Sequence, residues 1–178
     1  MTDEQLMEAV KNGDLSKASL LFERYHVRIY NFLLRMTAHR EVAEDLAQNV
    51  FVRLLRYRNT YKPELPFKAW IYQLARHAFS DYYQQAKKQR WVPLASATEM
   101  KDELQQALEQ EELERKLISA LARLDDDARE LLVLTRFQHL KYDEVAAQLG
   151  LTVANVKVKV HRAIGHLRNL YFQLETQA

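Results

Sequence analysis

The sequence is poor in the residues that interrupt helices or cross-link a chain. It has no cysteine, and only three glycines and three prolines among 178 residues. The absence of cysteine excludes disulfides, thiolate metal sites and cysteine nucleophiles. Because glycine and proline are disfavoured inside helices, their scarcity favours an all-α protein. No segment alternates β-branched and polar residues in the manner of a half-buried strand, so we expect no sheet.

Long apolar runs and a basic, apolar leader are also missing. No window approaches the ~20 apolar residues that span a bilayer. Residues 1–5 are polar and acidic, unlike the start of a signal peptide. With 48% hydrophobic and 28% charged residues, the composition is that of a folded, water-soluble protein. We therefore expect a cytoplasmic protein without membrane insertion.

Charge is unevenly distributed along the chain. Residues 1–92 and 131–178 carry a basic excess, whereas residues 93–130 are acidic overall. Two basic blocks on either side of an acidic segment suggest contact with a polyanion such as nucleic acid. The charges alone leave open that they segregate by chance on solvated helices.

Apolar residues at spacings of three and four predict helices along most of the chain. The two prolines within residues 59–66 exclude a continuous helix there, so this segment is expected to be a loop. The pattern predicts two small helical domains, residues 1–92 and 109–178, joined by a flexible linker over residues 93–108. The predicted helices lie within residues 3–40 (interrupted at 12–14), 41–58, 67–89, 109–124, 127–137, 142–149 and 153–171.

Residues 142–152 carry the most informative local pattern. Gly150 can adopt the left-handed conformation that ends a helix, and Thr152 can cap the helix that follows. A short helix, a turn with glycine and a longer amphipathic helix together are typical of a helix-turn-helix, whose second helix enters the major groove of DNA. The alternative is an ordinary helical hairpin with solvated lysines. The candidate DNA contacts are Thr152, Asn155, Lys157, Val158, Lys159 and Arg162.

Three segments resemble parts of bacterial sigma factors, in the order in which that family has them. Residues 43–51, with the sequence AEDLAQNVF, resemble the signature of sigma region 2. Residues 67–81 resemble the promoter-melting helix of the same region, and residues 124–170 resemble sigma region 4. Region 3 is missing. The chain is therefore similar to the extracytoplasmic-function (ECF) group of sigma factors, group 4 of the sigma-70 family.

This resemblance implies a protein that directs bacterial RNA polymerase core enzyme to specific promoters and helps to open the strands. It implies neither an enzyme nor a cofactor. The helix over residues 41–58 would dock on the clamp helices of the polymerase β′ subunit, and region 4 would lie at the β flap. An anti-sigma factor is an expected further partner. The polymerase-binding candidates are Glu44, Asp45, Gln48 and Asn49.

The resemblance also assigns the two basic parts to promoter DNA. Loop 59–66 and the helix after it would bind the non-template strand of the −10 element, where aromatic stacking and phosphate contacts hold unpaired bases. The last helix would read the −35 element. Trp70 and Phe79 are expected in the core, because their spacing places them on the apolar side. The −10 candidates are Tyr61, Lys62, Arg76, His77, Ser80, Lys87 and Lys88.

The chain departs from the family pattern at positions expected to touch DNA. His77 stands where the family commonly has asparagine, and Val158 stands where a hydroxyl would bond phosphate. Ala69 and Trp70 replace two adjacent aromatics of primary sigma factors. The promoter sequence therefore stays open. The acidic residues of the linker fit either a mimic of nucleic acid inside the polymerase or a solvated spacer; they are Glu99, Asp102 and Glu103.

Three other classes of function remain to be weighed. A helix-turn-helix regulator that binds DNA without polymerase would give Asp45 and Gln48 no special role. A carboxylate-bridged metal enzyme needs two Glu-x-x-His pairs on facing helices, and only Glu23 with His26 has that spacing. A partner-binding module is compatible with the sigma interpretation, since DNA-binding surfaces invite an inhibitor when idle.

Overall fold

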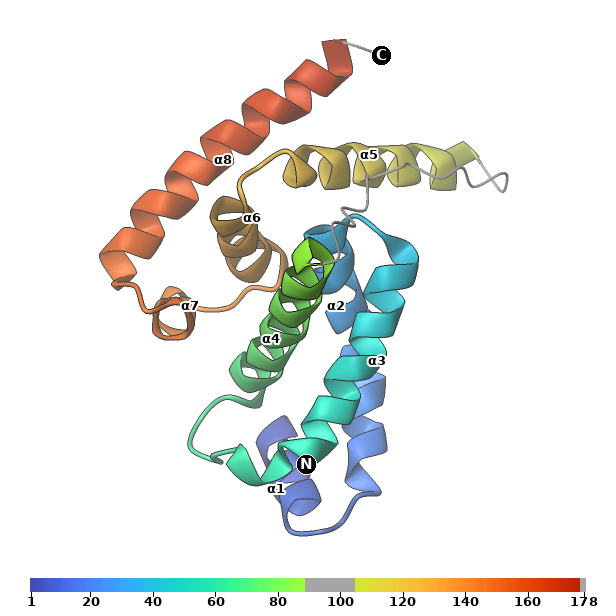
Figure 1. Ribbon diagram of the computed structural model, residues 1–178, viewed down its shortest axis with the longest axis vertical. Coiled ribbons are helices and arrows are strands. Elements are labelled where there is room, and N and C mark those ends of the chain that lie inside the picture. Colours follow the sequence, from blue (N-terminus) through green and yellow to red (C-terminus); the bar gives the residue numbers. More distant parts are fainter. Residues whose placement is uncertain (89–104, 177–178) are drawn as a thin grey trace. The chain divides into compact units, whose positions relative to one another are not determined.

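The computed structural model describes residues 1–88 and 105–176. All regular secondary structure within these ranges is helical, so the predicted all-α class is confirmed. The chain divides into two compact units, Met1–Val92 and Pro93–Ala178, which are described separately (Figure 1). Most of the predicted linker, including its acidic residues Glu99, Asp102 and Glu103, lies outside the described residues.

Within residues 1–88, the first unit contains four α-helices and one 3-10 turn. They are α1 (Asp3–Lys11), α2 (Lys17–Thr37), α3 (Arg40–Arg56), η1 (Arg58–Thr60) and α4 (Phe67–Lys88). Helices α2, α3 and α4 pack against one another, and α1 packs on α2, η1 and α4 (Figure 1). Each helix buries its apolar stripe at helical spacing, as the sequence pattern predicts.

Aromatic rings fill the centre of the first unit. The ring of Phe32 on α2 meets Tyr72 on α4 edge to face at 5.4 Å, and Tyr25 meets Phe67 in the same way at 5.1 Å. Edge-to-face pairs of this kind stabilise a core beyond the area that they bury. The pairs join α2 to α4 and so fix the position of α4, on which most −10 candidates lie.

The second unit contains α5 (Gln105–Ala122), α6 (Asp126–Leu132), the π-helical turn η2 (Val133–Phe137), α7 (Tyr142–Leu149) and α8 (Val153–Thr176). The Asp125 carboxylate accepts a hydrogen bond from the Ala128 N–H at 2.8 Å, which caps α6. Helix α5 already begins within the predicted linker. Helix α8 ends at Thr176 rather than at residue 171, where the apolar pattern weakens.

The helix-turn-helix has the predicted local geometry. Gly150 ends α7 with a φ of 66°, in the left-handed region. The Thr152 hydroxyl oxygen accepts from the Asn155 N–H at 3.2 Å and so caps α8. Both predictions are confirmed. Among the residues that the structure describes, no helix is long and apolar enough to cross a membrane.

Candidate functional site

The exposed side of α3 carries the predicted polymerase-binding residues. Ala43, Leu46 and Val50 are buried, which turns the opposite side of the helix outward. Residues three and four positions apart share one face of a helix, so the exposed polar side chains form one continuous strip. All four candidates are exposed; they are Glu44, Asp45, Gln48 and Asn49.

Asn49 has a second role that the spacing did not predict. Its side-chain oxygen accepts a hydrogen bond from Arg53 Nε at 2.6 Å. The guanidinium of Arg53 also forms an ion pair with Asp81 on α4, with 2.7 Å between nitrogen and oxygen. Asn49 therefore belongs to a polar link between α3 and α4, whereas Glu44, Asp45 and Gln48 form the outward part of the strip.

The −10 candidates on α4 lie on its exposed or half-exposed side. His77, Ser80, Lys87 and Lys88 are exposed, and Arg76 is half-buried. Spacings of three, four and seven place them along one side of the helix. Lysine and arginine side chains there can neutralise phosphates, and the Ser80 hydroxyl can bond them.

Tyr61 is not a surface group in this structure, although the sequence analysis places it among the contacts to −10 DNA. Its side chain is 0% exposed. The ring packs edge to face against Trp70 at 5.2 Å and Phe67 at 6.1 Å, and its hydroxyl donates to the Leu65 carbonyl at 3.0 Å. Tyr61 therefore fixes the shape of the loop from inside, and Lys62 beside it is exposed.

Burial also shifts the pKa of this phenol. Burial raises the pKa of Tyr61 to about 12, and the nearby carboxylates of Glu4 and Glu8 contribute to the shift. Like an ordinary tyrosine, whose pKa is about 10, Tyr61 is protonated at neutral pH and can donate to the Leu65 carbonyl, and burial extends the protonated range to higher pH. Burial likewise raises the pKa of Tyr25 and Tyr72 in the same unit.

His77 lies at the edge of a hollow with a volume of about 380 Å³ between α3, η1 and α4. Trp70, which is 9% exposed, and Leu74 contribute apolar surface to it. The polar residues that line it are Arg53, Tyr57, Thr60, Gln73, His77 and Asp81. Ring, amide and guanidinium groups can stack on and hydrogen-bond a nucleobase.

Sequence reasoning missed two exposed residues of α4, one that lines this hollow and one elsewhere on the helix. Gln73 precedes His77 by four positions, so helical spacing alone would have placed it on the same side of α4. Tyr83 is an exposed aromatic on the same helix. The ammonium nitrogen of Lys87 lies 4.9 Å from the centre of its ring, a cation–π geometry. Phe79, expected in the core, is only half-buried and stacks on Tyr83.

Helix α8 presents the predicted −35 contacts. Val156, Val160 and Ala163 are buried, and they set the rotation of the helix. All six candidates are exposed; they are Thr152, Asn155, Lys157, Val158, Lys159 and Arg162. Val158 is 50% exposed, so an apolar group does lie on this surface.

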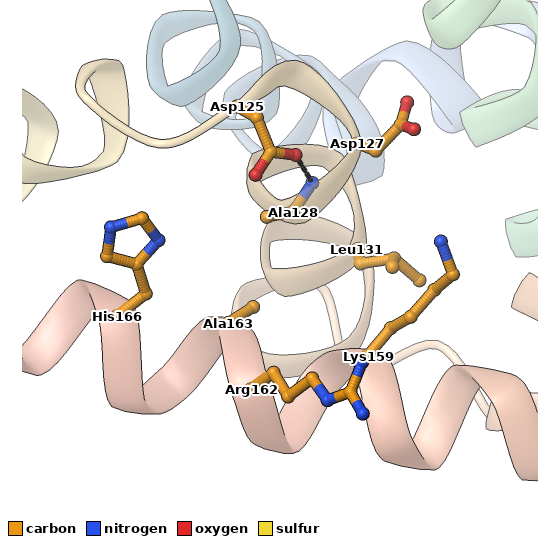
Figure 2. A pocket seen from close by; sticks show the side chains of 8 residues that line it. All are labelled: Asp125, Asp127, Ala128, Leu131, Lys159, Arg162, Ala163 and His166. Atoms are coloured by element: carbon orange, nitrogen blue, oxygen red, sulfur yellow. Dashed lines mark hydrogen bonds between the residues drawn. The ribbon is translucent and has the colours of Figure 1, made fainter.

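A second hollow, of about 210 Å³, lies between α6 and α8. Figure 2 shows Lys159 reaching from α8 toward α6, with Arg162 and His166 on the same helix. Asp125 and Asp127 line the opposite wall. Cations of the candidate recognition helix therefore lie close to the acidic first turn of α6.

The fold and these surfaces define a class of protein. One unit carries an exposed polar strip and a basic loop-and-helix surface, and the other carries a helix-turn-helix with an exposed basic face. This combination is typical of proteins that bind DNA at two places and a further protein at a third.

Comparison with known families identifies the class more closely. Residues 21–89 match the family model for sigma-70 region 2, and residues 114–167 match that for sigma-70 region 4. The RNA polymerase sigma factor YlaC of Bacillus subtilis is 31% identical over 147 residues, which are 80% of this chain and 85% of YlaC. The chain belongs to the ECF group of the sigma-70 family of RNA polymerase sigma factors.

One further relative supports the assignment, and a solved structure shares the fold. The ECF RNA polymerase sigma factor SigM of Bacillus subtilis is 31% identical over 154 residues, covering 85% of this chain and 93% of SigM. A co-crystal structure of the sigma factor RpoE with the anti-sigma factor NepR, from Bartonella quintana, has the same fold with a TM-score of 0.70 and 20% identity. The structural match covers 85% of this chain and 94% of the chain in that structure. As a sigma factor, the chain directs RNA polymerase to promoters.

Proposed function

We propose that the three surfaces divide the work of promoter recognition and opening. The strip on α3 docks on the β′ clamp helices of the polymerase core, and the surface formed by loop 59–66 and α4 holds the non-template strand of the −10 element. The exposed face of α8 reads the −35 duplex, with its unit at the β flap. Residues 1–92 thus form region 2 and residues 109–178 form region 4, with residues 93–108 as the linker.

The observation that carries this proposal is the orientation of α3 and α8. Each of these helices buries one apolar face and leaves its candidate residues on the other. On α3 the outward groups are carboxylates and amides, which suit a polar protein interface. On α8 they are mainly lysine, arginine and asparagine, which suit phosphates and base edges.

The hollow beside His77 supports the −10 role. Opening DNA exposes unpaired bases, and a protein can retain them by stacking and by hydrogen bonds to their edges. Trp70 and Leu74 supply apolar surface there, while Gln73 and His77 supply polar groups. In this proposal His77 takes part in base choice, which makes the −10 preference of this chain differ from that of relatives with asparagine.

Three further properties complete the proposal. The chain works in the cytoplasm and performs no catalysis of its own; strand opening is driven by binding energy. It is also held by an anti-sigma factor when idle, by analogy with RpoE, which is crystallised with the anti-sigma factor NepR. The exposed surfaces on both units are the ones that such a partner would cover.

The docking role is tested by the double variant Asp45→Ala with Gln48→Ala. We expect its affinity for purified core polymerase to fall by about tenfold or more, since central polar contacts of an interface carry much of its binding energy. Glu23→Ala removes an exposed carboxylate from α2 and is the matched control, with unchanged affinity expected. Unchanged affinity of the double variant would favour a regulator that binds DNA without polymerase.

Promoter-directed initiation is tested by run-off transcription. Core polymerase and the chain are given promoters selected from random templates, and initiation is compared with core polymerase alone. We expect initiation at defined positions only when the chain is present. If no template supports initiation that depends on the chain, promoter direction is refuted.

A further inference from the structure

Helix α1 packs beneath the candidate −10 loop. Leu6, Met7 and Val10 are each 0% exposed, so the helix is firmly seated on α2, η1 and α4 (Figure 1). It lies before residues 21–89, the part that matches the family model. The contacts of its polar residues are therefore interpreted from this structure.

The first turn of α1 caps the start of α4. Glu4 Oε1 accepts a hydrogen bond from the Phe67 N–H at 3.1 Å, across 63 residues of sequence. The first N–H groups of a helix have no partner within the helix. Pro66, whose carbonyl accepts from the Trp70 N–H, precedes α4 and has no side-chain oxygen with which to cap it. The Glu4 carboxylate supplies the missing acceptor, and its charge is favourable at the positive end of the helix dipole.

The last turn of α1 holds the other end of the loop. Lys11 Nζ donates a hydrogen bond to the Tyr61 carbonyl at 2.7 Å, across 50 residues. The loop between these two anchors is closed by its own hydrogen bonds. The Tyr61 hydroxyl donates to the Leu65 carbonyl, and the Leu65 N–H donates to the Lys62 carbonyl at 3.0 Å.

Helix α1 is itself anchored on the far side. Asp3 accepts hydrogen bonds from Arg24 and from the Tyr25 hydroxyl, each at 2.6 Å, and both donors belong to α2. The buried face and these bonds prevent α1 from sliding along α2. Glu4 and Lys11 are consequently held at a set distance from each other and from α2.

We propose that α1 positions the promoter-reading loop, with Glu4 and Lys11 as the two positioning residues. The inference rests on the proposed role of loop 59–66 in binding the −10 strand. Between the two anchors, Lys62, Glu64 and Leu65 are exposed. A loop whose ends are held loses less conformational entropy when it binds DNA, so the anchors raise affinity for the strand without touching it.

The test separates strand binding from polymerase binding. Holoenzyme with the full chain is mixed with a labelled single strand that carries the −10 sequence of a selected promoter. We expect Glu4→Ala and Lys11→Met each to lower strand affinity by about tenfold. Glu4→Gln keeps an acceptor and Lys11→Arg keeps a donor, so both should restore most of the affinity. Affinity for core polymerase should stay that of the wild type in all four variants.

Glu23→Ala is the matched control, because it removes an exposed carboxylate of the same unit from another helix, α2. It should bind the strand as the wild type does. If Glu4→Ala and Lys11→Met bind the strand like the wild type, the inference is overturned while the proposed function stands. It is also overturned if they lose polymerase and strand affinity equally, since α1 is then only a general support of the unit. If wild-type holoenzyme does not bind the strand, the proposed function itself fails.

Discussion

Replacement of Tyr61 distinguishes a core side chain from a DNA contact. The sequence places this tyrosine among the −10 candidates, whereas the structure buries it completely. A stacking residue on the surface contributes to DNA binding and little to stability. A buried one contributes mainly to stability. If Tyr61 is a core residue, its replacement therefore lowers mainly the free energy of unfolding. If it is a DNA contact, its replacement lowers mainly the affinity for the −10 strand.

The expected magnitudes follow from the contacts of the ring. Replacing a buried large aromatic by alanine costs about 3–5 kcal/mol of unfolding free energy, and the pairs with Phe67 and Trp70 favour the middle of that range, about 4 kcal/mol. Tyr61→Phe keeps the ring and removes the hydrogen bond to the Leu65 carbonyl. Its cost should be about 1 kcal/mol.

Urea unfolding followed by the fluorescence of Trp70 measures these values in the first unit. Trp91 is replaced by phenylalanine in every sample, so that Trp70 is the only tryptophan of the chain. The urea concentration at the midpoint of unfolding should fall for both variants. The dependence of the unfolding free energy on urea concentration should stay unchanged, because the area exposed on unfolding hardly differs. If Tyr61→Ala stays within about 0.5 kcal/mol of the parent and loses −10 strand affinity, the side chain faces DNA and the buried placement is wrong.

Three further predictions address other parts of the chain. Gly150→Ala places a methyl group in open space but at a φ of 66°, where an L side chain strains the backbone. The free energy of unfolding of the second unit should therefore fall by about 1 kcal/mol, and a much larger fall would indicate crowding at the turn. Lys159→Gln should weaken binding to all duplex sequences alike and reduce the slope of log binding constant against log salt concentration by about one. An unchanged slope would exclude a phosphate contact. Because the folded pKa of Tyr61 is about 12 and that of an unfolded tyrosine about 10, the folded state retains the proton over this interval, and stability measured by urea unfolding should fall as pH rises from about 10 to 12. Tyr61→Phe should make that fall smaller, and an equal fall in the variant would assign it to other groups.

Local signals account for the parts of the fold that were predicted. Helix α7 spans Tyr142–Leu149 as expected, because its end depends on Gly150 and the next start on Thr152. The π-helical turn was not foreseen. It includes a hydrogen bond from the Gln138 N–H to the Val133 carbonyl, five residues back, and the side-chain sequence gives no signal for that register.

Helical spacing also predicted which site residues would be exposed. The buried stripe of a helix can be recognised in the sequence, so the outward positions of Asp45, Gln48 and Lys159 follow from it. Loop 59–66 has no such period. Its lysine and its tyrosine were equally plausible surface groups, and the structure exposes Lys62 while it buries Tyr61.

The sequence by itself determined the helical class, the helix-turn-helix and the family, because these depend on residues within a few positions of one another. The tertiary structure alone decided the burial of Tyr61, the hollow beside His77 and the bonds from α1 to the loop. The bonds made by Glu4 and Lys11 span 63 and 50 residues. Such pairs meet only through the packing of α1 on α2 and α4, and no local spacing encodes that packing.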